Sequence, residues 1–434
     1  MKLDVEDIIN FVSKLLHKVL VSEISIDKAF QYVKSSWKDR ESFKIYYDIS
    51  FEVVKNYFKL RYLSKRIFGT ETCKDIVRTW LVLHGPEYFH KRNIIESYVK
   101  KLLRRRGLKN VDIRRMADEM IEELKDRDIT EYLSVKYSYP KTVIKILIEM
   151  LSINEVERLL SKLNNPTTWL RVNTLKIDID KCIKMLEKDN IIVEEDKDIP
   201  FLLKVVEARR PVHHADTIKN MLAIPQDKAS ILTVMELEPE KGDIIYDLCA
   251  APGMKSSLIM QLTENKAKLT LIDISRERVS NMIKILKKCG VDMSKVSIVL
   301  ADSKIVKLRM RDGCKILIDA PCSSSGAAGK DPAVRIALRE LKRLPWYVDI
   351  QLSILRNVLN QVRDSRIIYV TCSLLPQEGE ENIEKILDYS NVKLERPSSR
   401  FVEGYSRFKI GSMVGRTFPH VQDCEGFFIA KIVT

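Results

Sequence analysis

Two cysteines lie in short loops of small residues, each directly after a predicted strand. Cys322 belongs to the segment Asp319-Ala-Pro-Cys-Ser-Ser-Ser-Gly, and Cys372 to Thr371-Cys-Ser. If the two strands are neighbours, about 5 Å apart, both thiols and Asp319 face one pocket. A cysteine that only packs in the interior is the commoner case. The loop position of both residues nevertheless favours chemistry, because a thiolate is an intrinsically strong nucleophile.

One reaction that suits two thiols and a carboxylate is methylation of a cytosine ring at carbon 5. A thiolate that adds to carbon 6 makes the ring an enamine, and carbon 5 then attacks an electrophilic methyl group. Asp319 would stabilise the nitrogen 3 side of the ring, and Lys255 would supply positive charge near the thiolate. The residues alone leave open which cysteine attacks. A functional disulfide, as in a thiol-redox enzyme, is the competing use of the same pair, although a cytosolic setting disfavours it.

Carboxylates also follow three earlier predicted strands. Asp247 begins the segment Asp247-Leu-Cys-Ala-Ala-Pro-Gly-Met-Lys255, whereas Asp273 and Asp302 end the next two strands. Asp273 stands where a carboxylate accepts hydrogen bonds from ribose hydroxyls, the alternative being an N-cap of the next helix. The loop is neither G-x-G-x-x-G nor a P-loop. Strand-end carboxylates therefore favour a neutral or cationic nucleoside, such as the sulfonium S-adenosyl-L-methionine, over a phosphate-rich ligand.

Regular alternation of short apolar runs and helical stretches begins near residue 226. The predicted strands are Asp243–Leu248, Lys268–Asp273, Val296–Ala301, Lys315–Asp319 and Arg366–Thr371. The predicted helices are Lys255–Leu262, Arg276–Lys288, Leu341–Val362 and Glu381–Tyr389. This alternation is typical of a Rossmann-like α/β domain, a mostly parallel sheet with helices on both faces. A last apolar run, Gly426–Val433, is expected to close the sheet as an antiparallel strand.

The preceding residues divide into two further segments. Residues 129–225 mix helical stretches (142–151, 153–163) with strand-like runs at 169–172 and 191–194, which suits a small α/β RNA-recognition subdomain. Residues 1–128 show helical periodicity, as in Ile8, Ile9 and Val12 or in Ile94 and Tyr98. Gly69, Gly85 and Gly107 are expected to end helices. The predicted domains are therefore an all-α domain at 1–128, a subdomain at 129–225 and a catalytic domain at 226–434.

The charge of the chain favours a polyanionic partner. The net charge is +14 and the pI about 9.2. Basic residues are frequent from His90 to Arg115, and they include the run Arg104, Arg105 and Arg106. This stretch is either a solvated helix face or a surface that contacts phosphates.

Other classes of protein are disfavoured by composition. No apolar run is long enough to span a membrane, and the N-terminal residues do not resemble a signal peptide. The expected location is therefore cytoplasmic, with reduced thiols. The eight cysteines include no C-x-x-C pair and have no histidine at zinc spacing, so no metal is expected.

Four segments resemble, in order, the motifs of the Sun/Fmu (RsmB-like) family of RNA cytosine carbon-5 methyltransferases. They are DLCAAPGMKSS, LIDISRER, DAPCSSSG and TCSLLPQEGEENI. The end of the chain, with Arg416-Thr-Phe-Pro-His420 and Gly426-Phe-Phe-Ile-Ala-Lys, resembles the close of the family's catalytic domain. The resemblance implies methylation of cytosine carbon 5 in ribosomal or transfer RNA with S-adenosyl-L-methionine. It makes Cys372 the nucleophile and Cys322 the residue that lets the covalent adduct break down, whereas DNA cytosine methyltransferases use the cysteine of the PC motif as nucleophile.

The same resemblance implies the residues that bind the cofactor and the RNA. Residues that bind or border the cofactor and the target base are Cys249, Ala250, Ala251, Pro252, Gly253, Met254, Lys255, Asp273, Arg278, Asp302 and Asp319. Arg171-Val-Asn-Thr-Leu-Lys176 resembles the family's RNA-recognition subdomain, which makes Arg171 and Asn173 RNA-binding candidates. The first 128 residues resemble the NusB-like domain of the bacterial ribosomal-RNA members.

Two departures and three alternatives accompany this interpretation. Met254 stands where the family more often has glycine, which would narrow the cofactor pocket, and Ser256 where threonine is common. A catalytically inactive RNA-binding or assembly protein of the same fold, a thiol-redox enzyme and a DNA methyltransferase are the alternatives. The expected partner is RNA, and the expected oligomeric state is a monomer.

Overall fold

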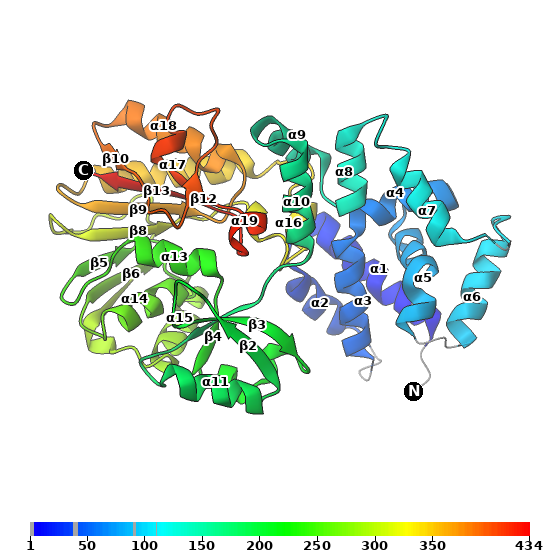
Figure 1. Ribbon diagram of the computed structural model, residues 1–434, viewed down its shortest axis with the longest axis horizontal. Helices are drawn as coiled ribbons and strands as arrows, with labels where there is room; N and C mark the ends of the chain where they lie inside the picture. Colours follow the sequence, from blue (N-terminus) through cyan, green and yellow to red (C-terminus); the bar gives the residue numbers. More distant parts are fainter. Residues whose placement is uncertain (1–3, 38–41, 90–92, 110) are drawn as a thin grey trace. The chain divides into compact units, whose positions relative to one another are not determined.

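The computed structural model describes residues 4–37, 42–89, 93–109 and 111–434 (Figure 1). The chain divides into two units, residues 1–164 with 328–342 and residues 165–327 with 343–434. The boundary predicted at residue 128 does not separate these units. Helices α8, α9 and α10 follow that position, but α8 packs against α4 and α7 within the first unit.

The first unit is helical over the residues described. Its helices are α1 Val5–Ser22, α2 Ile26–Lys34, α3 Phe43–Lys55, α4 Tyr57–Phe68, α5 Cys73–Tyr88, α6 Asn93–Arg104, α7 Ile113–Glu122, α8 Ile129–Tyr137, α9 Lys141–Met150, α10 Ile153–Asn164 and α16 Ala333–Ala337. Helix α16 comes from a segment between two strands of the second unit and packs against α1 and α3. No sequence pattern indicated that residues 328–342 complete the helical core formed by residues 1–164.

Helical periodicity predicted the buried face of α1 correctly. In α6 the buried residues lie one position later in the sequence than predicted. Ile8, Ile9 and Val12 of α1 are fully buried. In α6, Ile95 and Val99 are buried, whereas Ile94 is 63% exposed. The expectation that Gly85 ends a helix is also wrong, because it lies inside α5. A side chain there would meet Ile95 at 3.1 Å, so this glycine lets α5 and α6 approach closely.

The second unit begins with an antiparallel four-stranded sheet in the order β2-β3-β1-β4. Its elements are β1 Trp169–Val172, α11 Ile179–Lys188, β2 Ile191–Glu195, β3 Leu202–Ala208, α12 Asp216–Lys219 and β4 Ala223–Pro225. This β-α-β-β-α-β order with alternating pairing is the ferredoxin-like arrangement. The predicted strands at 169–172 and 191–194 are β1 and β2. The sequence analysis missed β3 and β4.

A larger mixed sheet carries the two cysteine loops. Among the described residues its order is β11-β12-β13-β9-β8-β5-β6-β7, with β10 also paired to β13. The strands are β5 Ile244–Asp247, β6 Lys268–Asp273, β7 Val296–Leu300, β8 Lys315–Asp319, β9 Arg366–Thr371, β10 Lys393–Glu395, β11 Val402–Glu403, β12 Gly415–Thr417 and β13 Phe427–Val433. Strands β5 to β9 are parallel, and β13 runs antiparallel to β9, as predicted. Strand β13 does not end the sheet, however, because β12 pairs with its other side.

Helices cover both faces of this sheet, so each face has its own apolar core (Figure 1). One core contains residues of α13 Lys228–Glu236, α14 Met254–Leu262 and α15 Arg276–Lys288; the other contains residues of α17 Leu344–Leu359 and α18 Glu380–Tyr389. A short helix, α19 Pro419–Gln422, precedes β13. Burial on both faces explains why the parallel strands are apolar runs without alternation. Over the described residues, no helix is long and apolar enough to cross a membrane.

Candidate functional site

The carboxyl ends of β8 and β9 bring the two cysteines together. These strands are neighbours and parallel, with Asp319 beside Val370. Cys322 and Cys372 lie in the loops that follow, and their Sγ atoms are 3.1 Å apart. That distance is much longer than a disulfide bond of about 2.05 Å, and both residues are free thiols. The two thiols therefore lie side by side at the ends of neighbouring strands.

The surroundings of the thiols differ. A hydrogen bond with Cys372, together with burial, raises the pKa of the Cys322 thiol well above its ordinary value. Cys322 therefore keeps its proton near neutral pH. The Cys372 thiol also donates a hydrogen bond to Ser324 Oγ at 3.4 Å. The geometry thus pairs a protonated thiol with a second thiol that contacts it.

Lys255 and Asp319 form an ion pair next to the cysteines. Lys255, in the first turn of α14, donates to Asp319 Oδ2 at 2.6 Å, and its side chain is 11% exposed. Burial alone would lower the pKa of Lys255, but the negative charge of Asp319, with a contribution from Cys372, raises it. The ammonium is therefore charged and lies near Cys372. Cys322, Cys372, Asp319 and Lys255, all predicted as catalytic, converge at one sheet edge.

The segment 249–255 comprises the loop between β5 and α14 and the first turn of α14, and its loop is held by the end of the next strand. Asp273 accepts hydrogen bonds from the backbone amides of Ala251 at 3.3 Å and Ser275 at 3.0 Å. Arg278 pairs with Asp273 at 3.3 Å and also donates to the carbonyl of Ala251. Ser275, not Asp273, is the N-cap of α15, so the N-cap alternative for Asp273 does not hold. Asp273 and Arg278 thus shape the loop that was predicted to bind the cofactor.

Close packing explains the glycine in this loop. Gly253 has a φ of +97° and a side chain there would lie 2.9 Å from Met282 of α15. Ala250 and Ala251 are buried, and burial raises the pKa of Cys249 well above its usual range. Met254 packs against the apolar core below the loop. Asp302, after β7, accepts a hydrogen bond from the amide of Lys304 at 2.9 Å and is 25% exposed.

Two acids outside the predicted set of site residues stand close to this site: Asp247, which the sequence analysis noted only as a strand-end carboxylate, and Glu378, which it missed. Burial raises the pKa of Asp247 to about 7. Glu378, fully buried, accepts hydrogen bonds from Ser323 and Ser373, the residues that follow the two cysteines. The sequence analysis noted Asp247 as the acid that opens the first motif but gave it no role of its own. Nothing in the local pattern around Glu378 distinguishes it from the other acids of its segment.

The prediction that Arg171 and Asn173 contact RNA is corrected by their burial. Both side chains are at most 1% exposed. Arg171 donates to Gln226 at 2.7 Å, Gln261 at 2.5 Å and Ser257 at 2.7 Å. Asn173 donates to the carbonyls of Met221 and Cys289. These contacts hold β1 of the ferredoxin-like sheet against α14 and the end of α15, so the two residues position the subdomain.

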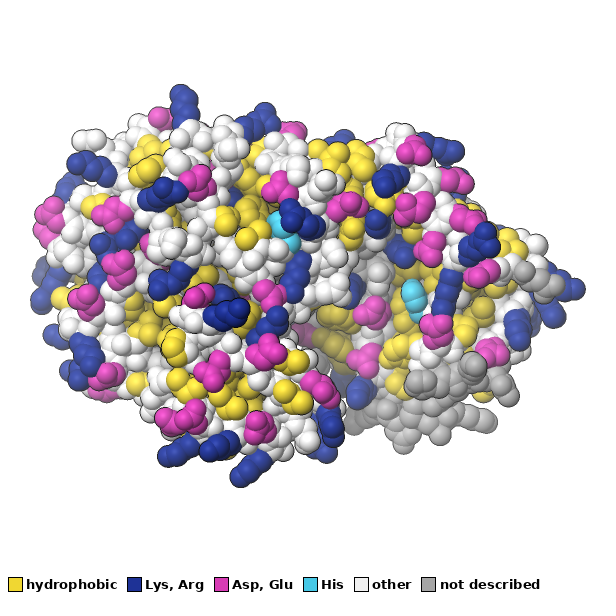
Figure 2. Space-filling view, in the orientation of Figure 1, with side chains coloured by type: hydrophobic (Ala, Val, Ile, Leu, Met, Phe, Trp, Pro, Cys, Tyr) yellow, Lys and Arg dark blue, Asp and Glu magenta, His cyan; other side chains and the backbone are white. Residues whose placement is uncertain are grey.

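Arg104, Arg105 and Arg106 lie at the end of α6 and directly after it, all exposed. Arg106 lies over the ring of Phe68 at 5.6 Å. Other cations of the predicted basic stretch pair with acids, namely Lys100 with Glu96, Arg114 with Glu87 and Arg115 with Glu119. His90, Lys91, Arg92 and Asn110 lie outside the described residues. Lys and Arg alternate with acidic side chains over the face in Figure 2, so no broad basic surface is visible there.

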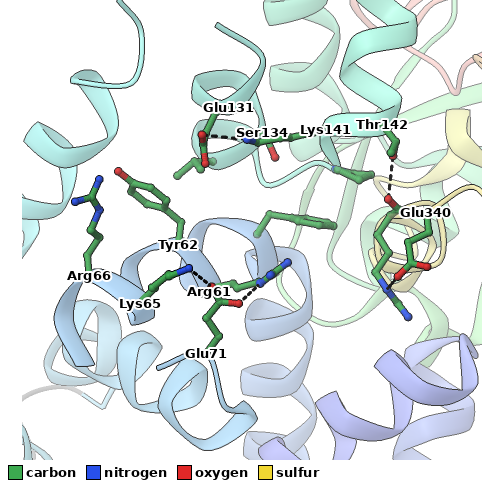
Figure 3. Close-up of a pocket in the computed structure, with 14 residues that line it drawn as sticks. Arg61, Tyr62, Lys65, Arg66, Glu71, Glu131, Ser134, Lys141, Thr142 and Glu340 are labelled. Atoms are coloured by element: carbon green, nitrogen blue, oxygen red, sulfur yellow. Dashed lines mark hydrogen bonds and ion pairs between the residues drawn. The ribbon is translucent and has the colours of Figure 1, made fainter. Parts of the chain in front are cut away.

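A cavity of about 620 Å³ lies within the helical unit (Figure 3). Arg61 and Lys65 point toward Glu71, and Lys141 pairs with Glu131. Arg66 lies over the ring of Tyr62 at 5.5 Å. The acids neutralise most of the basic side chains, and the cavity is lined by none of the cysteines or strand-end carboxylates described above. Among the described residues, no group of His, Cys, Asp or Glu could hold a metal ion.

Comparison with protein families agrees with this architecture. Residues 234–433 match the family of 16S rRNA methyltransferases RsmB/F, and residues 139–213 match the ferredoxin-like domain of RsmF/B-like methyltransferases. The second match begins at the end of α8, earlier than the sheet itself.

Curated relatives are rRNA methyltransferases by name. The 28S rRNA (cytosine-C(5))-methyltransferase of Mus musculus is 28% identical over 314 residues, which cover 69% of this chain and 39% of that protein. The 26S rRNA (cytosine-C(5))-methyltransferase nsun-1 of Caenorhabditis elegans is 30% identical over 66% of this chain and 44% of that protein. The probable ribosomal RNA small subunit methyltransferase B of Coxiella burnetii is 25% identical over 89% of this chain and 91% of that protein. The matched part of this chain spans about two fifths of the length of the two animal proteins.

Solved structures share the fold. The crystal structure of NSun6 from Pyrococcus horikoshii with SFG, an analogue of S-adenosylmethionine, is 22% identical and covers 71% of this chain and 97% of its own, with a TM-score of 0.57. The crystal structure of PH0851 is 22% identical and covers 100% of both chains, with a TM-score of 0.74. Its mixed methyltransferase sheet and its ferredoxin-like sheet are both matched, so residues 139–213 and 234–433 of the chain belong to the RsmB/F family of rRNA methyltransferases.

Proposed function

We propose that this protein transfers the methyl group of S-adenosyl-L-methionine to carbon 5 of a cytosine in ribosomal RNA through a covalent adduct with Cys372. The observation that carries the proposal is the pair of thiols 3.1 Å apart beside the Lys255–Asp319 ion pair. The names of the relatives support ribosomal rather than transfer RNA as the substrate.

The residues at the ends of β5, β6 and β7 fit a nucleoside cofactor with a cationic centre. The buried Oδ1 of Asp247 has no hydrogen-bond partner among the described residues. Asp302 keeps part of its carboxylate exposed. Both therefore offer acceptors for hydroxyl or amino groups, while Asp273 and Arg278 hold the loop 249–255 that would enclose the ligand. The cofactor supplies an electrophilic methyl group when bound.

The chain's own residues account for the other steps. The Sγ of Cys372, once deprotonated, forms a bond to carbon 6, and the electron pair of the C5–C6 double bond forms the bond from carbon 5 to the methyl group. The carbon–sulfur bond of the sulfonium would break at the same time, and its electron pair would stay on sulfur as a neutral thioether. Asp319 stabilises the nitrogen 3 side of the ring, and Lys255 supplies positive charge next to Cys372. Removal of the carbon 5 proton then restores the double bond and breaks the bond to Sγ. Cys322, in contact with Cys372, assists this release.

Replacing each cysteine tests the proposal. Cys372→Ala should still bind cofactor and RNA but lose methylation, because no enamine forms. Cys322→Ala should attack yet release slowly, so an RNA–protein adduct that resists boiling in detergent should accumulate. The double variant, as a control, should give no adduct. Adduct with Cys372→Ala and none with Cys322→Ala would reverse the roles, and full activity of both single variants would rule out covalent catalysis.

The helical unit supports a further part of the proposal. We propose that it is a NusB-like RNA-binding domain and that the exposed Arg104, Arg105 and Arg106 contact phosphates. A catalytically inactive protein of this fold is not favoured, because the residues that catalysis would need are present and paired. Cys322 contacts Cys372, and Lys255 contacts Asp319. Monomeric state and cytoplasmic location stay predictions.

A further inference from the structure

We propose that Glu378 is the residue that positions the two reacting thiols, by binding the serine that follows each of them. This inference rests on the proposed function and adds a residue to it. Glu378 lies in the short helical turn Pro376–Glu378 after β9 and is fully buried. In this proposal it does not reach the substrate, and it acts on the cysteines through the two serines and through its charge.

The contacts of Glu378 join both loops at one carboxylate. Its Oε1 accepts a hydrogen bond from the amide of Ser323 at 2.8 Å, and its Oε2 accepts the hydroxyl of Ser323. The same Oε2 accepts the hydroxyl of Ser373 at 2.6 Å. The two serine hydroxyls also lie 3.3 Å apart. Cys322 and Cys372 are therefore each one residue away from a group anchored on the same side chain.

The residues before the two cysteines are held by the same element. The backbone carbonyl of Glu378 accepts a hydrogen bond from Thr371 Oγ1 at 3.3 Å. Gln351 of α17 donates both to Glu378 Oε1 at 3.1 Å and to the carbonyl of Pro321 at 2.8 Å. Each cysteine is thus fixed on both sides, at Pro321 and Ser323 or at Thr371 and Ser373. Neither cysteine can move along its loop without breaking one of these hydrogen bonds.

The charge of Glu378 also affects the thiols. The amide and hydroxyl of Ser323, the hydroxyl of Ser373 and the side-chain amide of Gln351 all donate to its carboxylate. After the hydrogen bond with Cys372 and burial, the negative charge of Glu378 also raises the pKa of Cys322. Glu378 therefore helps keep the proton on Cys322 while it sets the spacing of the two sulfur atoms. A residue with a purely structural role would not alter the ionisation of Cys322.

The first test compares Glu378→Gln with Glu378→Asp and with Glu381→Gln, which removes a partly exposed carboxylate from α18. Methyl transfer at saturating cofactor should fall about 10- to 100-fold in Glu378→Gln, because small misplacements of reacting groups have effects of this size. The KM for cofactor should stay unchanged. Glu378→Asp should lose less activity, and Glu381→Gln should match the wild type. Methylation by Glu378→Gln within about twofold of the wild type, at the same KM, would overturn the proposal.

A second test needs no RNA. The rate at which iodoacetamide alkylates Cys322 is followed by mass spectrometry across pH in the full-length protein. Glu378→Gln should make Cys322 react severalfold faster at pH 8, because loss of the charge lowers its pKa. An unchanged pH profile would contradict the role of Glu378. If the wild type does not methylate rRNA, the proposed function fails, while this measurement still decides the positioning.

Serine variants cover the case in which Glu378→Gln does not fold. Ser323→Ala and Ser373→Ala each remove one hydroxyl donor and should lower methyl transfer severalfold, with thermal midpoints close to the wild type. The double variant should lose less than the product of the two single losses, because the two serines share one carboxylate. Wild-type methylation by the double serine variant would overturn the proposal even if Cys372→Ala is inactive.

Discussion

Asp247 ends β5 with its carboxyl group in the interior of the protein. Its Oδ2 accepts a hydrogen bond from Ser256 at 2.7 Å, and its Oδ1 has no partner among the described residues. Burial is the main reason that its pKa rises from 3.8 to about 7, and the charge of Asp319 adds to the shift. The neutral carboxyl is therefore the form that the folded protein prefers below neutral pH.

This preference predicts a pH-dependent stability. The folded state binds the Asp247 proton up to about pH 7, whereas the unfolded chain releases it near 3.8. The contribution of the Asp247 proton to the free energy of unfolding is therefore complete below pH 3.8. It is lost as the pH rises toward 7, which lowers the free energy of unfolding by on the order of 4 kcal/mol. Asp247→Asn, which mimics the neutral acid, should remove this loss. The free energy of unfolding of the wild type and of Asp247→Asn is measured with urea between pH 4 and 8. If it changes with pH in the same way for both proteins, the raised pKa of Asp247 is contradicted.

The contact between the Cys322 loop and β13 depends on two glycines. Gly326 accepts a hydrogen bond from the amide of Gly426 at 3.0 Å and donates one to the carbonyl of Cys372 at 3.0 Å. A side-chain carbon on Gly326 would lie 1.8 Å from the carbonyl oxygen of Gly426. Since that obstacle is backbone, it cannot rotate away. The two loops meet only because position 326 has no side chain.

Gly326→Ala should therefore separate the cysteines. We expect methyl transfer to fall about 100-fold, because the Cys322 loop must move away from Cys372, while cofactor affinity stays near that of the wild type. The control is Gly313→Ala, at a glycine of the same unit with φ +72° and open space around it, which should lose some stability but no activity. Equal activity of Gly326→Ala and Gly313→Ala would show that the close approach does not matter.

At the scale of the molecule, the net charge is +14, and many of the basic side chains form ion pairs whereas others do not. Many basic side chains of the helical unit pair with acids, as do Arg114 and Arg115. Arg104, Arg105 and Arg106 differ, because none of the described acids forms an ion pair with them. Free cations release counterions when they bind phosphates, so they contribute most to the salt dependence of RNA binding.

Changing Arg104, Arg105 and Arg106 to Gln should weaken binding to all RNAs. The log–log slope of affinity against salt should flatten by up to about 0.9 for each lost contact. As a control, Lys100→Gln with Arg115→Gln neutralises cations that already pair with Glu96 and Glu119, and should change the slope less. Filter binding of ribosomal RNA fragments at several salt concentrations measures this. An unaltered slope would mean that the three arginines are only solvated.

Local patterns in the sequence were sufficient to place strands β5 to β9 along the chain and to find the motifs at their ends. Parallel strands of βαβ units end at one sheet edge, so residues after each strand must lie together. Cys322, Cys372, Asp319 and Lys255 could be predicted for that reason.

Contacts between distant segments were decided only by the tertiary structure. Arg171 is buried because α14 supplies its hydrogen-bond acceptors from 86 and 90 residues away. Residues 328–342 join the helical unit for a similar reason, because their partners lie in α1 and α3. The role inferred for Glu378 depends on Ser323, 55 residues earlier in the chain. Periodicity and motif spacing report which element forms and where it ends, whereas the partner of a buried polar side chain is set by packing that no local pattern encodes.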